Sequence, residues 1–199
     1  MLKLFAKLLR KINPSSTLNC ELDITSSVGG GSFLEYVKLG RYSYCGYRCN
    51  IANCVIGSFC SVADDVYIGG SQHDVGKVST TPLFYTDSVI GKAWAIDTSE
   101  RIKKSTLGHD VWVGSRVMIK AGINIGTGSV LGMGSIVTKD IPPYEIWGGN
   151  PARKIKDRFD PITKNKLLLS KWWECDKKEL IKIISYTNDP ITFLSKIDN

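Results

Sequence analysis

Residues 107–142 read LGHDVWVGSRVMIKAGINIGTGSVLGMGSIVTKDIP, and they repeat every six residues. Each hexad begins with an aliphatic residue, and its fifth residue is small or β-branched. The leading residues are Leu107, Val113, Ile119, Ile125, Leu131 and Val137, and the fifth-place residues are Val111, Val117, Ile123, Ser129, Ser135 and Ile141. An α-helix repeats at about 3.6 residues and a strand at about two, so neither explains this period. It indicates a coil of short parallel strands joined by tight bends, with both sets of side chains directed inward.

The same period occurs nearer the N-terminus. Its leading residues are Leu39, Cys45 and Ile51, followed by Ile56, Val62 and Ile68. The step from Ile51 to Ile56 is five residues, which predicts one bend shorter by a residue. Segments 18–22 and 24–28 are candidates for a degenerate first coil.

Composition and charge exclude several classes of protein. The 199 residues are 43% hydrophobic and 23% charged, as in ordinary globular domains. No apolar run is long enough for a membrane-spanning helix. The net charge of +7 divides into +4 for residues 1–13, −1 for residues 14–148 and +4 for residues 149–199. A nearly neutral coil argues against a nucleic-acid surface.

The six cysteines favour core packing over disulfides or metal binding. Cys45, Cys49 and Cys60 occupy inward hexad positions, and their spacing lacks the paired C-x₂-C of a zinc module. Lys7 interrupts the apolar N-terminal stretch, so that stretch is not a secretory signal. We therefore expect reduced thiols, no bound metal and a cytoplasmic protein.

The repeat stops at Gly69-Gly70 and resumes at Leu107, which leaves an insertion over about residues 69–106. A segment of this length that leaves a regular coil and carries His73 and several aromatic residues is typical of a functional loop. We divide the chain into a basic amphipathic segment (1–15), a β-helix with an inserted active-site loop (16–148) and a C-terminal helical extension (149–199).

Three short helices are expected in that extension. Asp160-Pro161 and Asp189-Pro190 each pair an N-cap with a proline at the first helical position, and Asp176 with Glu179 forms a capping box. The expected buried stripe is Leu168, Leu169, Trp172 and Trp173.

Seven local motifs carry a resemblance that covers residues 37–185. They are IGSFCSV (56–62), IGGSQH (68–73), VSTTPLFY (78–85), GHDVWVG (108–114), VTKDIPPY (137–144), GGNPAR (148–153) and KWWE (171–174). The chain resembles the hexapeptide-repeat acyltransferases, in the branch of the xenobiotic (antibiotic) acetyltransferases and the polysaccharide O-acetyltransferases. The resemblance implies a mainly β fold, a left-handed parallel β-helix of triangular section with about 18 residues per coil, a long inserted loop and a short C-terminal helical segment.

The resemblance also implies a site. His73 matches the catalytic base, and acetyl-CoA, the acyl donor, would lie between adjacent prisms of a homotrimer. The matching donor contacts are Ser115, Met133, Thr138 and Lys139, with Arg153 and Lys156 at the 3′-phosphate. Trp112 would flank the thioester arm or pack between subunits. Tyr85 and Trp94 in the insertion would stack on the acceptor or hold the loop against a neighbouring subunit.

The expected reaction is direct acetyl transfer to a hydroxyl, because a neutral imidazole is a suitable base near pH 7. The leading acceptor is a sugar of a surface polysaccharide, and the alternative is an antibiotic hydroxyl of the chloramphenicol or streptogramin type. His109, in the third place of a hexad, is expected on the surface without a role. A zinc enzyme of the carbonic-anhydrase type is disfavoured, because its metal needs three histidines and the chain has two. A non-enzymatic scaffold and a nucleic-acid-binding protein are the remaining, less favoured alternatives.

The basic segment lies outside the resemblance. Its apolar residues at helical spacing are Leu4, Phe5, Leu8, Leu9 and Ile12. They favour peripheral contact of residues 1–12 with the inner face of a membrane or packing within the trimer, and the sequence does not choose between the two.

Overall fold

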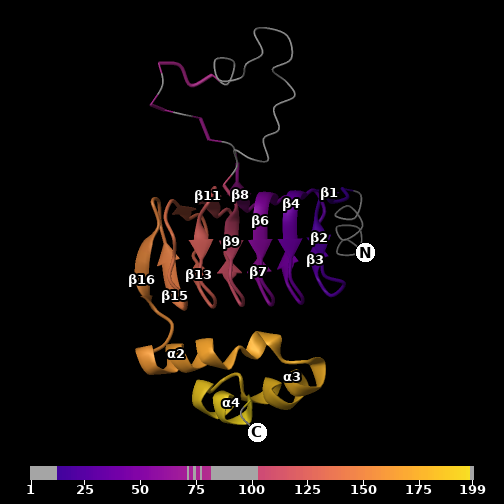
Figure 1. Cartoon of the computed structure of the whole chain (residues 1–199), viewed down its shortest axis with the longest axis vertical. Helices are drawn as coiled ribbons and strands as arrows, with labels where there is room; N and C mark the ends of the chain where they lie inside the picture. The colour runs from indigo at the N-terminus through magenta and orange to yellow at the C-terminus, as the bar shows by residue number, and fades with distance from the viewer. Residues whose placement is uncertain (1–12, 71, 74, 77, 82–102, 198–199) are drawn as a thin grey trace, which may run out of the picture.

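A computed structural model describes residues 13–70, 72–73, 75–76, 78–81 and 103–197. The strands stack as successive coils of one prism, and three helices lie along one of its edges, opposite the side from which the insertion leaves (Figure 1). Tyr85, Trp94 and the basic residues 1–12 lie outside the described residues. No helix in the described part of the chain is long and apolar enough to cross a membrane.

The strands are β1 (Ser16–Leu18), β2 (Glu21–Leu22), β3 (Ser27–Val28), β4 (Phe33–Leu39), β5 (Tyr44–Cys45), β6 (Asn50–Ile56), β7 (Ser61–Val62), β8 (Tyr67–Gly69), β9 (Ser105–Leu107), β10 (Trp112–Val113), β11 (Met118–Lys120), β12 (Asn124–Ile125), β13 (Val130–Leu131), β14 (Ile136–Val137), β15 (Glu145–Gly148) and β16 (Arg153–Asp157). The helices are α2 (Pro161–Ser170), η3 (Trp172–Glu174), α3 (Lys177–Ile183), η4 (Ile184–Tyr186) and α4 (Pro190–Ile197).

Parallel pairing between coils builds three faces. The first face runs through β1, β4, β6, β8, β11 and β14. The second contains β2, the far halves of β4 and β6, then β9 and β12. The third runs β3-β5-β7-β10-β13-β15, and β16 closes it by antiparallel pairing with β15.

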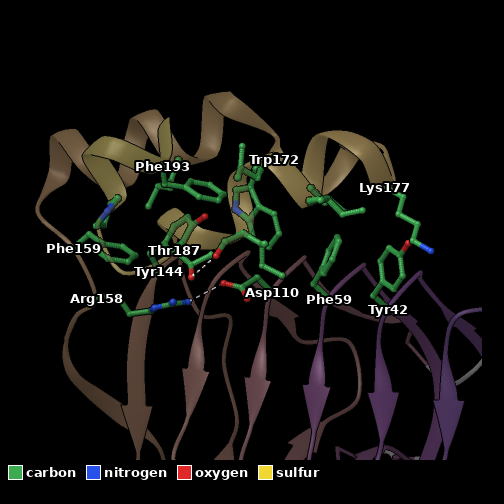
Figure 2. Close-up of a pocket in the computed structure, with 16 residues that line it drawn as sticks. Tyr42, Phe59, Asp110, Tyr144, Arg158, Phe159, Trp172, Lys177, Thr187 and Phe193 are labelled. Carbon is green, nitrogen blue, oxygen red and sulfur yellow. Dashed lines mark hydrogen bonds and ion pairs between the residues drawn. The ribbon is translucent and has the colours of Figure 1, made fainter. Parts of the chain in front are cut away.

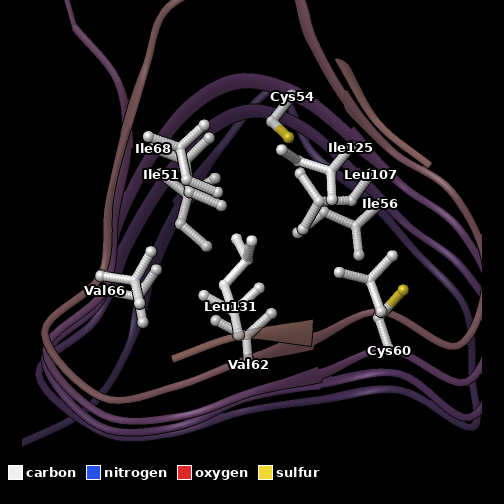
Figure 3. Packing of buried hydrophobic residues seen from close by; sticks show 14 of the residues in the cluster. Ile51, Cys54, Ile56, Cys60, Val62, Val66, Ile68, Leu107, Ile125 and Leu131 are labelled. Atoms are coloured by element: carbon white, nitrogen blue, oxygen red, sulfur yellow. The ribbon is translucent and has the colours of Figure 1, made fainter. Parts of the chain in front are cut away.

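The interior of the prism is filled by the residues that the period predicts. Every leading and fifth-place side chain from Leu39 to Ile141 in the hexads described above is buried. Figure 3 shows these side chains pointing into a common interior of triangular outline. Cys45, Cys49, Cys54 and Cys60 are free thiols in this core, as predicted for the inward cysteines. Burial raises the pKa of the Cys54 thiol to about 12, so it stays protonated near neutral pH.

Coil length differs between the two halves of the prism. Phe33 pairs with Asn50, 17 residues on, whereas Met118 pairs with Ile136, 18 residues on. The short step predicted between Ile51 and Ile56 is therefore real. Apolar residues of the first coil, by contrast, are largely exposed: Leu18, Leu22 and Ile24 lie at its open end.

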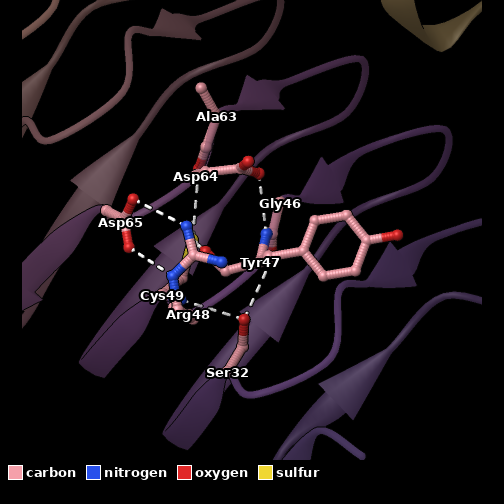
Figure 4. A network of polar contacts seen from close by, with 8 residues as sticks. All are labelled: Ser32, Gly46, Tyr47, Arg48, Cys49, Ala63, Asp64 and Asp65. Carbon is pink, nitrogen blue, oxygen red and sulfur yellow. Dashed lines mark hydrogen bonds and ion pairs between the residues drawn. The ribbon is translucent and has the colours of Figure 1, made fainter. Parts of the chain in front are cut away.

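Each bend of the prism contains a residue with positive φ, and these residues stack into edges. One edge, here called the charged edge, consists of Gly31, Arg48, Asp65, Arg116 and Gly134. In Figure 4 the Arg48 guanidinium binds both oxygens of Asp65, at 2.7 and 2.9 Å, and Asp64 accepts from the backbone N–H of Tyr47.

A second edge, here called the aromatic edge, consists of Tyr42, Phe59, Asp110, Gly128 and Tyr144. Bulky side chains seldom adopt positive φ, because Cβ then crowds the following carbonyl oxygen. This edge is covered by the C-terminal helices (Figure 1).

The helices begin where the caps predict. Asp160 accepts from two backbone N–H groups of α2, Asp176 and Glu179 form both halves of the capping box, and Asp189 caps α4. The predicted buried stripe is wrong at Leu169, which is 73% exposed, and Leu167 is buried in its place. The reason is that α2 turns its Leu167 side toward Tyr144, Ile183 and Phe193, with which it forms a small second core.

Candidate active site

The insertion leaves the prism at the end of β8. Gly69 pairs with Lys120 of β11, and a Cβ at Gly69 would lie 2.4 Å from the carbonyl oxygen of Ala52. Only glycine therefore fits this exit. Three residues later, Gln72 Nε2 donates to the carbonyl of Ala121 at 3.4 Å, which ties the start of the insertion to the neighbouring coil.

His73 follows directly and is exposed, with its ring held by the insertion itself. Its Nδ1 lies 2.6 Å from the carbonyl oxygen of Thr80. A carbonyl oxygen can only accept, so Nδ1 carries the hydrogen and Nε2 of the neutral ring carries the lone pair. The backbone of Thr80 thus supplies the orienting group that the sequence left unidentified. This arrangement leaves Nε2 able to take a proton.

His109 differs from its expected surface position. It is half-buried, its ring stacks on Trp173 with centroids 4.9 Å apart, and Nδ1 accepts from the backbone N–H of Ser58. Burial lowers the pKa of this imidazole, which favours the neutral form that accepts this hydrogen bond. The expectation failed because residues far along the chain fold back over the GHDVWVG bend.

The predicted donor contacts fall into separate groups. Ser115 and Met133 stack at the charged edge, where the N–H of Gly134 donates to the Ser115 carbonyl and the Met133 side chain is 78% exposed. Thr138 and Lys139 follow β14, and Lys139 Nζ lies 5.3 Å from the ring centroid of Trp147.

Arg153 and Lys156 are exposed on β16, at the C-terminal end of the prism. Trp112 is exposed on the third face, in register with Ser61 and Val130. Among the described residues, no hydrogen bond, ion pair or ring contact joins any of these seven to His73. Within one chain the structure therefore presents the base and the predicted donor contacts as separate parts.

Metal ligands are not gathered in the part of the chain that the structure describes. No group of three or more His, Cys, Asp or Glu residues there is placed to hold a metal ion.

The chain is similar to known acetyltransferases. The chloramphenicol acetyltransferase of Klebsiella aerogenes is 38% identical over 157 residues, covering 69% of this chain and 75% of that enzyme. The galactoside O-acetyltransferase of Escherichia coli K12 is 54% identical over 55 residues, covering 28% of this chain and 27% of that enzyme. No family model matches the chain.

A solved structure shares the fold. AntD, an N-acyltransferase from Bacillus cereus in complex with dTDP and 3-hydroxybutyryl-CoA, matches with a TM-score of 0.51 and 20% identity, over 83% of this chain and 95% of AntD.

A parallel β-helix of hexads with one long insertion and a helical C-terminal end defines an acyltransferase of the hexapeptide-repeat class. The chain belongs to the hexapeptide-repeat acetyltransferases, the family of the chloramphenicol acetyltransferase to which it is similar. The family, the fold class and the enzyme class predicted from the sequence are confirmed.

Proposed function

We propose that the protein transfers an acetyl group from acetyl-CoA to a hydroxyl group, with His73 as the general base. The observation that carries this proposal is the contact between His73 Nδ1 and the Thr80 carbonyl, because it leaves Nε2 unprotonated in the neutral ring. The exposed position of His73 on the insertion gives an acceptor access to that atom.

In this reaction Nε2 takes the proton of the acceptor hydroxyl as its oxygen attacks the thioester carbonyl. The tetrahedral intermediate collapses by breaking the C–S bond, and the imidazolium returns the proton to the leaving thiolate. The products are the acetyl ester and CoA. Hydrogen bonding of Nδ1 to Thr80 keeps the ring orientation fixed through both proton transfers.

The outward side chains of the prism support a trimer with sites between subunits. The first face exposes Phe33, Tyr67 and Met118, and the third exposes Tyr44 and Trp112. These two faces flank the charged edge, where Ser115 and Met133 lie. The second face is polar instead, with a Glu21–Lys38 ion pair and hydrogen bonds among Thr106, Asn124 and Asp140. A prism with two apolar faces can bury both against copies of itself, with the donor groove at their boundary.

Two acceptors are supported by different observations. The 55-residue similarity to a galactoside O-acetyltransferase supports a sugar hydroxyl, as the VSTTPLFY motif did. The longer similarity to a chloramphenicol acetyltransferase supports an antibiotic hydroxyl. Acetyl-CoA consumption assayed with chloramphenicol, a streptogramin and surface oligosaccharides distinguishes the two.

The test of the base is His73→Ala. Loss of a general base typically lowers kcat by about 100-fold or more, and we expect this loss with normal acetyl-CoA binding by calorimetry and an unchanged Tm. Val75→Ala, an exposed change in the same insertion, is the matched control and should keep wild-type kcat. Near-normal kcat in His73→Ala would refute the assignment.

A further inference from the structure

A cavity of about 570 Å³ lies between the aromatic edge and the C-terminal helices. Figure 2 shows its wall, where Tyr42 and Phe59 project from the prism and Trp172 and Phe193 face them from the helices. The mechanism proposed above uses none of these residues. The cavity also lies on the other side of the prism from the insertion that carries His73 (Figure 1).

The wall is a chain of aromatic rings. Centroids are 5.1 Å apart for Tyr42 and Phe59, 5.0 Å for Phe59 and Trp172, and 6.0 Å for Trp172 and Phe193. Successive rings are tilted or edge-on to one another, so faces and edges both line the space. Such a wall offers stacking and edge-to-face contacts to a flat, apolar molecule.

Few polar groups line the cavity, and most are already paired. Arg158 Nη1 donates to Asp110 at 3.1 Å and to the Gly128 carbonyl at 2.5 Å. The Tyr144 hydroxyl is buried at the inner end and has no hydrogen-bond partner among the described residues. Burial raises the pKa of Tyr144 to about 12, so its hydroxyl is a donor near neutral pH. An unpaired buried hydroxyl costs about 1–3 kcal/mol, which an acceptor atom would recover.

The mouth of the cavity is apolar as well. Ile181 and Ile184 line it and remain 65% and 68% exposed. The sequence gave no sign of this site, because it forms between residues as distant as Tyr42 and Phe193.

We propose that this cavity is a second ligand site, for a planar, uncharged, largely apolar molecule with one hydrogen-bond acceptor. Aromatic walls and apolar rim residues bind the body of the ligand, and the Tyr144 hydroxyl donates to its acceptor atom. A free sugar fits poorly, since its several hydroxyls would meet too few unpaired polar groups.

Nile red, a neutral planar dye with one carbonyl, is a suitable probe with the full-length protein. Its emission should rise and shift to the blue on binding, saturating at one dye per chain. Ile184→Trp narrows the cavity and should raise the Kd at least about tenfold, a change of about 1.4 kcal/mol. Ile162→Trp places the same side chain on α2 at a position 70% exposed and away from the cavity lining, so it should bind as wild type.

Tyr144→Phe keeps the ring and removes only the donor, so it should weaken binding by a smaller factor of about five to tenfold. Circular dichroism confirms that each variant is folded, and acetyl transfer should be unchanged in all three. Equal dye affinity in Ile184→Trp and Ile162→Trp, or binding that does not saturate at one dye per chain, would overturn the proposal. Because the dye readout needs no acetyl transfer, its failure is distinct from a failure of His73 as the base.

Discussion

The aromatic edge and the charged edge occupy equivalent bends of the same coil, yet they are finished differently. At the aromatic edge, Phe59 and Tyr144 project toward helices that the chain itself supplies. At the charged edge, Arg48 and Asp65 pair with each other between two apolar faces that the described chain does not cover. Buried hexad positions build the prism, and the outward bend positions are left to decide what each edge contacts.

This difference predicts that substitutions on the two edges have very different consequences. The helices should contribute stability through the aromatic edge. Pairs on the charged edge lie in water within one chain, where an ion pair adds little.

The largest effect is expected for Trp173→Ala. Trp173 is 6% exposed and stacks on His109, so truncation leaves a cavity where the helical segment contacts the prism. The free energy of unfolding should fall by about 4 kcal/mol, measured by urea denaturation. Leu169→Ala, an exposed change one helix earlier, should cost less than about 0.5 kcal/mol. Similar losses in both variants would show that the helices do not depend on this contact.

A smaller effect is expected for the two arginines. Arg158 binds Asp110 and Gly128 and packs over the Tyr144 ring, so Arg158→Ala should cost about 2 kcal/mol. Arg48→Ala removes an exposed pair and should cost less than about 1 kcal/mol. Urea denaturation of both variants in one buffer gives the comparison, and an equal cost would mean that the edges do not differ as described.

The smallest effect is a difference in pH dependence between the two aspartates. The hydrogen bond from Arg48 lowers the pKa of Asp65, so its stabilisation is present above the unfolded pKa and is lost as pH falls through the folded pKa. Burial raises the pKa of Asp110, so the folded state binds that proton more tightly and gains stability on acidification.

Between about pH 7 and pH 3, Asp65→Asn should therefore lose less stability than wild type, and Asp110→Asn should lose more. Urea denaturation at several pH values measures both. Slopes that change in the same direction for the two variants would contradict these signs.

The sequence predicted what depends on local period and missed what depends on distant contact. Ile125 and Cys60 were placed inward because the hexad repeats at six, and both are buried. Asp160 was placed at a helix start because capping is a local rule. The contact between His73 and the Thr80 carbonyl has no side-chain signature at residue 80, since every residue has a carbonyl. His109 was misplaced because its partner, Trp173, lies beyond the prism in the sequence.

The insertion leaves the prism after Gly69 and returns at Ser105, and β6 pairs with both β8 and β9 on the two sides of that gap. The ladder of backbone hydrogen bonds is therefore continuous across the point where the chain departs. This makes the segment an exchangeable cassette: its length and sequence can change without altering coil register or core composition. New acceptor preferences could be acquired by grafting this one excursion, while the scaffold that stacks the coils stays the same.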